Sequence, residues 1–133
     1  MGDAVRLTIP RTRPYYGVAR LVVGGLAARL DLSWEDLEDL QVALESVVAN
    51  DAYAAGGDVT VELAVGADAM EVLIGPLDGG RLESDLSSEE EAETERVGLR
   101  RLLATVVESA DVESRDGASW LRLRKPLPRG ARA

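Results

Sequence analysis

The stretch DVTVELAVGADAMEVLI, residues 58–74, decides the fold that this sequence predicts. Apolar and polar residues alternate on either side of the Gly-Ala-Asp at residues 66–68. The alternating apolar residues are Val59, Val61, Leu63, Val65, Met70, Val72 and Ile74. A period of two is typical of a strand with one buried face, and Gly-Ala-Asp is typical of a turn. The stretch therefore predicts an antiparallel β-hairpin that must bury one face against another layer.

A strand and two helices are predicted on the N-terminal side of the hairpin. Residues 4–9 alternate, and Pro10 ends that strand. Residues 14–30 place apolar side chains at helical spacing on Val18, Leu21, Val22 and Leu26. Ser33 begins the second helix, because its hydroxyl can cap the helix and the acidic residues after it suit the positive end of the dipole. We expect this helix to end at the glycine pair 56–57.

A long loop, a helix and a second hairpin are predicted on the C-terminal side. Residues 76–95 are rich in glycine and acidic residues, and we interpret them as a lid loop. Residues 96–109 predict a third helix, and Asp116-Gly117 predicts the turn of a final hairpin. The order of elements predicts an α+β fold, a two-layer sandwich with helices on one face of a mostly antiparallel sheet. We expect one domain over residues 1–126 and a flexible basic tail over residues 127–133.

The composition of the 133 residues excludes several classes of function. The chain contains no Cys and no His, which excludes thiol nucleophiles, disulfides, Ser-His-Asp triads and nearly every zinc site. Its net charge of −9 repels nucleic acid and anionic membranes. No apolar run approaches the ~18 residues that a membrane helix needs, and the N-terminus has no apolar signal-peptide core. The composition predicts a cytoplasmic protein without a nucleic-acid or membrane partner.

The charge is unevenly distributed along the chain. Residues 82–95 contain seven Asp or Glu and no basic residue, whereas the chain from Arg115 onward contains six basic residues and one acid. A solvated loop and a solubilising tail account for this pattern. The alternative interpretation is an acidic lid and a basic edge that binds a partner.

Three further stretches carry a resemblance to a known family. They are EDLQVAL at residues 38–44, VVESADVES at residues 106–114, and the closing Asp116-Gly117 turn with LRLRK at residues 121–125. They resemble the run into the N box, the end of the last helix with the strand after it, and the final turn and strand of the RsbW-type bacterial anti-sigma factors. These small proteins double as serine kinases. The resemblance covers nearly the whole chain, and it implies the GHKL ATPase (Bergerat) fold, a sigma factor or STAS-type anti-sigma antagonist as partner, and a homodimer.

The catalytic motif of that family is altered in this sequence. In the family, a Glu on the N-box helix is the general base, and an Asn four positions later holds the magnesium of ATP; the matching positions here are Ser46 and Asn50. Glu45 is adjacent to Ser46, but a helix turns about 100° per residue. We therefore expect Ser46 and Asn50 to share a helix face that lines a cleft beneath the lid, and Glu45 to face elsewhere. A Ser without an activator cannot replace a carboxylate as base, so no catalytic residue is assigned.

The nucleotide-binding motifs also depart from the family pattern. The Asp that accepts from adenine would fall near Pro76, and we interpret Asp78-Gly79-Gly80 as a turn rather than as a displaced motif. The glycine-rich turn that would hold phosphates is reduced to Gly98. Asn50 and Gly98 are the candidate cofactor-binding residues, with Asn50 as the magnesium ligand if ATP binds. We expect weak or absent ATP binding and therefore no cofactor, with Mg-ATP as the alternative.

The candidate partner-binding residues are Tyr15, Tyr16, Arg20 and Trp120. The two tyrosines begin the first helix, and Trp120 alternates to the same strand face as two arginines. An exposed aromatic residue flanked by arginines has the composition of a binding hot spot. The alternative is that one tyrosine packs in the core and that Trp120 caps a sheet edge.

Three hypotheses for function follow. The leading one is a regulatory protein like the anti-sigma factors, which binds a sigma factor or an antagonist and has weakened or lost ATP-dependent kinase activity. The second is an active serine kinase that phosphorylates an anti-sigma antagonist, which requires Glu45 to be re-aimed. The third is an α+β domain of unrelated function. Nucleotide affinity separates the first two, and a co-purified sigma factor or antagonist separates both from the third.

Overall fold

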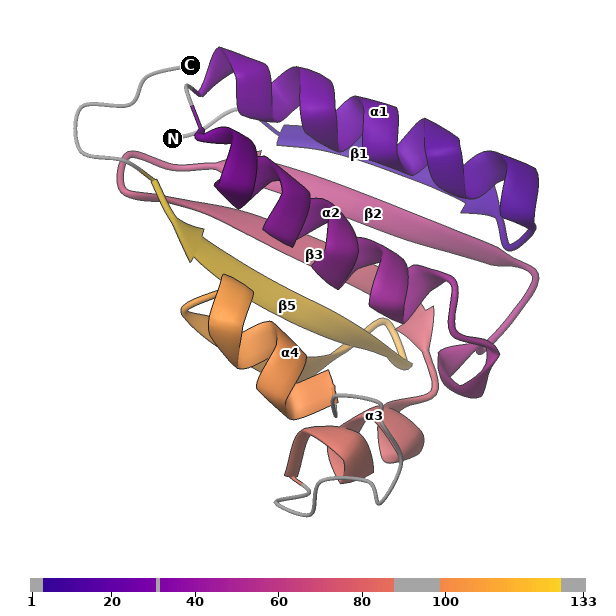
Figure 1. The fold of residues 1–133 in the computed structure, drawn as a ribbon. Coiled ribbons are helices and arrows are strands. Elements are labelled where there is room, and N and C mark those ends of the chain that lie inside the picture. The colour runs from indigo at the N-terminus through magenta and orange to yellow at the C-terminus, as the bar shows by residue number, and fades with distance from the viewer. Residues whose placement is uncertain (1–3, 31, 88–98, 128–133) are drawn as a thin grey trace.

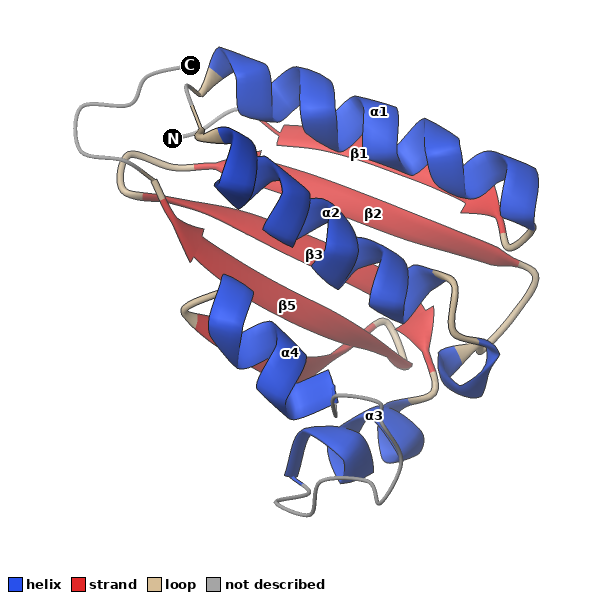
Figure 2. Ribbon diagram, viewed as in Figure 1, coloured by secondary structure: helices blue, strands red, loops and turns tan. Residues whose placement is uncertain are grey.

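The computed structural model describes residues 4–30, 32–87 and 99–127. Within these residues, five strands form one sheet in the order β1-β2-β3-β5-β4, and every pair of neighbouring strands is antiparallel. Helices α1, α2 and α4 lie on one face of the sheet, with α2 in the middle of the helical layer (Figure 1; Figure 2). The predicted two-layer α+β sandwich is therefore confirmed.

The elements follow the predicted order, with one helix added. In chain order they are β1 (Ala4–Pro10), α1 (Arg13–Arg29), α2 (Trp34–Val48), the 3-10 helix η1 (Asp51–Tyr53), β2 (Asp58–Val65), β3 (Ala69–Leu77), α3 (Gly79–Ser87), α4 (Leu99–Val106), β4 (Ser109–Arg115) and β5 (Ala118–Pro126). The edge strands are β1 and β4, and β3 lies at the centre of the sheet. No helix within the described residues is long and apolar enough to cross a membrane.

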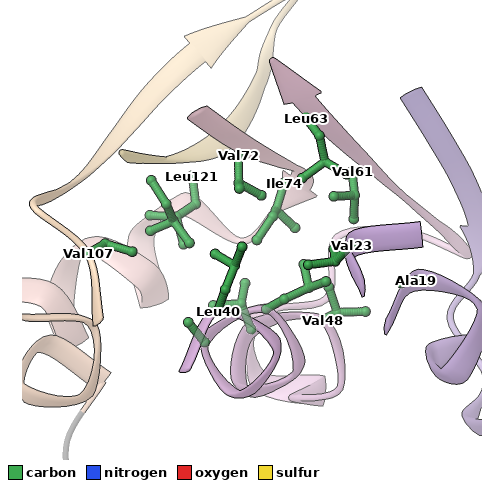
Figure 3. Close-up of a cluster of buried hydrophobic side chains, with 14 of the residues drawn as sticks. Ala19, Val23, Leu40, Val48, Val61, Leu63, Val72, Ile74, Val107 and Leu121 are labelled. Atoms are coloured by element: carbon green, nitrogen blue, oxygen red, sulfur yellow. The ribbon is translucent and has the colours of Figure 1, made fainter. Parts of the chain in front are cut away.

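The hairpin of β2 and β3 forms as its alternation predicted. The pairing runs from Thr60 opposite Gly75 to Val65 opposite Met70. All seven alternating apolar residues are buried. Figure 3 shows members of this set pointing toward Leu40 and Val48 of α2. The core therefore lies between the central strands and the helical layer, and α2 is held directly over it.

The buried face of α1 differs from the predicted one. The residues that it buries are Ala19, Val23 and Ala27, four positions apart. Val22 and Leu26 are partly buried, but Val18 and Leu21 are exposed. The prediction of the face was therefore wrong at two positions. Because apolar residues occur nearly all round α1, their spacing alone did not identify the side that packs on the sheet.

The start of α2 was predicted correctly and its end was not. The Ser33 hydroxyl accepts a hydrogen bond from the Asp36 amide at 3.0 Å, which is the expected cap. The helix ends at Val48, well before the glycine pair 56–57. Asn50 has extended backbone angles, and its side-chain oxygen accepts from the Ala52 amide at 2.9 Å. That local bond gives the backbone an alternative to continuing the helix.

The predicted lid loop is partly a helix. β3 continues to Leu77, and residues 79–87 form α3, so the loop assignment is wrong there; residues 88–95 lie outside the described residues. Asp78 caps α3, because its Oδ1 accepts from the Arg81 amide at 3.1 Å. The interpretation of Asp78-Gly79-Gly80 as a turn is corrected to that of a helix start. An N-cap and a turn use the same residue types, which is why the sequence left them unresolved.

The C-terminal third agrees with the predicted elements. Of the third predicted helix, residues 96–98 lie outside the described residues. α4 ends at Val106 and β4 begins at Ser109, so the predicted end at residue 109 was wrong. Asp116 and Gly117 have φ angles of 52° and 80°, the left-handed pair that a two-residue type I′ hairpin turn requires. Leu127 donates its amide to Asp68 O at 2.8 Å, and the rest of the predicted tail lies outside the described residues.

Candidate functional site

Ser46 occupies the position at which the resemblance implies a general base. It lies in the last turn of α2 and is half-buried, and its hydroxyl donates a hydrogen bond to Ala43 O at 2.7 Å. This bond satisfies the hydroxyl proton inside its own helix. A serine needs a neighbouring base to become nucleophilic or basic, and the chain contains no His. Ser46 therefore offers a weak hydrogen-bonding group where a carboxylate would be required.

Glu45, the carboxylate nearest in sequence, points toward α1. Its Oε2 accepts from Arg20 Nη1 at 3.4 Å, and both side chains are about half exposed. Gln41, one turn earlier on α2, donates from Nε2 to Arg20 O at 3.1 Å. The two contacts define one side of α2 that lies against α1. Glu45 therefore faces away from Ser46, as the helical geometry predicted.

Asn50 lies beyond the end of α2, so it does not share a helix face with Ser46 and that expectation was wrong. Its side-chain oxygen caps η1 through the Ala52 amide. Its main-chain oxygen accepts from Arg11 Nη2 at 3.0 Å. The oxygen that would bind magnesium therefore already accepts one hydrogen bond from the backbone. Asn50 is exposed, and its cap and the Arg11 contact hold it in place.

A contact between η1 and α3 was missed in the sequence. Tyr53 is buried, and its hydroxyl donates to Asp85 Oδ2 at 2.5 Å. Arg81 Nε approaches the same oxygen at 3.4 Å. The Asp78 amide donates to Tyr53 O at 2.9 Å, and the side chain of Leu82, a residue of α3, is fully buried. These contacts attach the first part of the predicted lid to the segment that carries Asn50. The signal that could have revealed α3 is the cap-and-charge pattern of an Asp followed by an Arg–Asp pair four residues apart.

The Tyr53 hydroxyl is the most strongly perturbed acid of the described residues. Burial raises its pKa well above the usual value of about 10, and the hydrogen bond to Asp85 and the charge of that carboxylate raise it further. Arg81 opposes the shift. Since the folded-state pKa lies above the unfolded-state value, Tyr53 adds stability that is fully present below pH 10 and is lost as the pH rises above it.

We expect Tyr53→Phe to lower the free energy of unfolding at pH 7 by about 1–2 kcal/mol, because Asp85 loses its donor. The difference between wild type and variant should shrink above about pH 10, where ionisation of Tyr53 in the unfolded chain weakens the wild type. Urea unfolding at pH 7 and at about pH 10.5 measures both values. Tyr15→Phe, at an exposed tyrosine, is the control. If the difference between wild type and Tyr53→Phe were the same at both pH values, it would contradict the raised pKa of Tyr53 in the folded protein.

The candidate partner-binding residues fall into two places. Tyr15, Tyr16 and Arg20 lie in the first two turns of α1; Tyr15 and Arg20 are exposed, and Tyr16 is half-buried against the core. One tyrosine thus packs partly in the core, as the alternative interpretation held. Trp120 lies on β5, whose neighbour Leu121 faces the helices, so the indole is on the opposite face of the sheet from α1.

Trp120 is buried, with 7% of its surface exposed, so the expectation of an exposed aromatic anchor is wrong. Its ring packs over Gly75 of β3, and the Arg115 guanidinium lies 4.9 Å from the ring centroid. Arg115 is held in turn by Glu62 of β2 at 3.0 Å. The alternative of an edge cap is also wrong, because β5 lies between β3 and β4. Because Gly75 has no side chain, the indole of Trp120 fills the space above it. This contact between β3 and β5 depends on the register of the sheet.

The remaining nucleotide-site candidate, Gly98, lies outside the described residues. Among the residues that the structure does describe, no group of three or more Asp, Glu, His or Cys side chains gathers in a way that could hold a metal ion. In the described part of the site, Ser46 and Asn50 are hydrogen-bonded within the chain, as are Glu45 and Asp78.

Comparison with known proteins identifies relatives of this chain, although no family model matches it. It is 28% identical over 103 residues to a protein of Halalkalibacterium halodurans named serine-protein kinase RsbW, and the match covers 63% of this chain and 64% of that protein. It is 31% identical over 77 residues to the protein of that name from Oceanobacillus iheyensis, a match covering 54% and 49%.

A protein of the same name from Listeria monocytogenes is 32% identical over 79 residues, with 56% of this chain and 50% of that protein covered. The chain thus spans between about half and two thirds of the length of the curated relatives that it matches. These matches agree with the family that the resemblance named. The chain is a relative of the RsbW-type serine-protein kinases.

Proposed function

We propose that this chain is a regulatory protein of the anti-sigma type, which binds a sigma factor or a STAS-type antagonist and has weakened or lost ATP-dependent kinase activity. The kinship with RsbW supports the class of protein. The weakened or lost activity is supported by Ser46, which stands where the resemblance implies a carboxylate. The Ser46 hydroxyl is bonded to Ala43 O, and the nearest carboxylate along the chain is paired with Arg20.

The alternative function is an active serine kinase, which the names of the relatives favour. It requires Glu45 to act as the general base. Glu45 would have to break its ion pair with Arg20 and turn by about 100° around α2 to reach the azimuth of Ser46. The exposed pair itself is weak, but the rotation would displace the buried residues of the same helix. The geometry therefore supports the regulatory function over the catalytic one.

The residues of the nucleotide site fit Mg-ATP poorly. Magnesium prefers near-ideal octahedral oxygen ligation, commonly with one or two carboxylates. Asn50 Oδ1 is engaged with the Ala52 amide, and Asp78 is engaged as the cap of α3. We therefore derive no phosphoryl-transfer step for this chain. Its control then comes from competition between partners for one surface, or from another kinase.

The process in which the protein acts, its location and its oligomeric state are also proposed. We propose that it acts in transcription regulation in the cytoplasm and forms a homodimer, as the resemblance to the family implies. The net charge of −9 supports a protein partner over nucleic acid. The first turns of α1, with Tyr15, Tyr16 and Arg20, are the proposed contact for that partner, since two of these three side chains are exposed.

The proposal is tested by identifying the protein that co-purifies with the chain and by repeating the capture with variants. We expect Tyr16→Ala and Arg20→Ala each to weaken binding by roughly 1–3 kcal/mol, the usual range for interface anchors. Asn50→Ala should leave binding nearly unchanged. Arg29→Ala, which removes another exposed arginine of α1, is the matched control for Arg20. Loss of the partner only in Asn50→Ala would show that the nucleotide site governs binding.

A further inference from the structure

Helices α1 and α2 are neighbours in the helical layer. They lie side by side (Figure 1). The residues that contact one another follow opposite directions along the two helices. Arg20 contacts Glu45. Gly24 lies beside Gln41, because a Cβ placed on Gly24 would be 3.5 Å from Gln41 Nε2. The helices are therefore antiparallel, and these residues mark the seam between them.

The three most exposed large hydrophobic side chains of the described residues belong to these two helices. They are Leu21, Trp34 and Val42, with exposed fractions of 77%, 71% and 50%. Leu21 follows Arg20 and Val42 follows Gln41, so each is turned about 100° from the seam toward solvent. Trp34 lies two turns before Gln41, on the side of α2 that borders α1. We call these three residues the α1–α2 outer surface.

On the α2 side of this surface, two exposed carboxylates have no ion-pair partner among the described residues. Glu35 and Glu38 are exposed, and they lie seven and four residues before Val42, on the same side of α2. Two other acids of this helix are paired, Asp36 with Lys125 and Glu45 with Arg20. Within the part of the chain that the structure describes, neither Glu35 nor Glu38 has an ion-pair partner. The surface thus combines exposed apolar side chains with free carboxylates.

We propose that the α1–α2 outer surface is a docking site for a basic amphipathic helix of a partner protein. The apolar face of such a helix would cover Leu21, Trp34 and Val42, and its lysines or arginines would pair with Glu35 and Glu38. A second copy of this chain fits less well, because a two-fold contact would bring two sets of unpaired carboxylates together. An anionic membrane is repelled by the same charge. The proposal goes beyond the function proposed above, since it needs neither Tyr15 nor Tyr16 and does not depend on which regulator is bound.

The test uses a synthetic helix of about 18 residues that presents leucine on one face and lysine on the other, with a leucine–glutamate helix as its counterpart. Titration calorimetry on the full chain should show binding of the lysine peptide and none of the glutamate peptide. Leu21→Ser combined with Val42→Ser should weaken the lysine peptide at least about tenfold. Val5→Ser, at an exposed apolar residue of β1, should leave binding unchanged. No binding of the lysine peptide, or an equal loss in the Val5 control, would overturn the proposal.

A second comparison separates this site from general attraction to an acidic protein. Glu35→Gln with Glu38→Gln removes two negative charges beside the surface, and Asp111→Asn with Asp116→Asn removes two at exposed positions of the β4–β5 hairpin. The first pair should weaken peptide binding at low salt several-fold more than the second. Equal losses would overturn the proposal. A dimer in light scattering that dissociates on Leu21→Ser and Val42→Ser would also overturn it, by showing that a second copy covers the surface.

Discussion

Gly75→Ala is expected to lower the free energy of unfolding by about 3 kcal/mol, near the upper end of overpacking costs. A Cβ at Gly75 would collide with Trp120 Cδ2, and two further ring atoms would lie within 2.7 Å of it. The indole is rigid and buried, and Arg115 lies over its ring. Neither the ring nor the central strand β3 can move without disturbing neighbouring strands. Urea unfolding followed by tryptophan fluorescence measures the change.

The control for this prediction is Gly56→Ala. Nothing lies within 4 Å of a Cβ at Gly56, and the residue does not have a positive φ. Its free energy of unfolding should stay within about 1 kcal/mol of wild type, because the substitution only reduces the freedom of the unfolded chain. If Gly75→Ala were as mild as Gly56→Ala, the packing of Trp120 over β3 would be disproved.

Leu121→Ala should lower the free energy of unfolding by about 2–5 kcal/mol. Leu121 is fully buried and points from β5 into the core beneath the helical layer (Figure 3). It pairs with Ile74 on one side and with Val112 on the other, so the cavity would open beside these residues, between the sheet and the helical layer. Sheet register holds these strands apart, which limits how far the core can collapse into the space.

Leu21→Ala provides the matched comparison for the same change of side chain. Leu21 is 77% exposed on α1, and its truncation should change the free energy of unfolding by less than about 0.5 kcal/mol. Thermal unfolding of the two variants gives the contrast directly. A cost above 2 kcal/mol for Leu21→Ala would mean that this residue is covered in the native protein. That result would imply that a second copy of the chain covers the α1–α2 outer surface in the isolated protein.

The parts of the fold that were predicted from the sequence depend on local patterns. Strict alternation identified β2 and β3, a Ser cap identified the start of α2, and Asp116-Gly117 identified the last turn. The buried face of α1 was not identified, because Val18 and Leu21 are as apolar as the residues that pack. The helix α3 was missed because its sequence is polar apart from two leucines, and its stability depends on Tyr53, which lies on a distant segment.

In the candidate site, the orientation of a side chain could be predicted where it depends on a single helix. The direction in which Glu45 points was predicted from helical geometry. Its partner Arg20, on another helix, was not predicted. The burial of Trp120 was not predictable, because it requires Gly75 to lie beside it across β3 and β5 and Arg115 to reach over it from β4. Such contacts depend on strand order and register, which single-strand patterns do not contain.

We propose that this relative of the RsbW kinases regulates by binding and not by phosphoryl transfer. Titration calorimetry of the full chain with Mg-ATP tests it most directly, with Asn50→Ala measured in parallel. We expect no saturable binding, or a dissociation constant of about 1 mM or weaker, corresponding to about −4 kcal/mol, and no effect of Asn50→Ala. A dissociation constant of about 1 μM that is lost in Asn50→Ala would contradict the account.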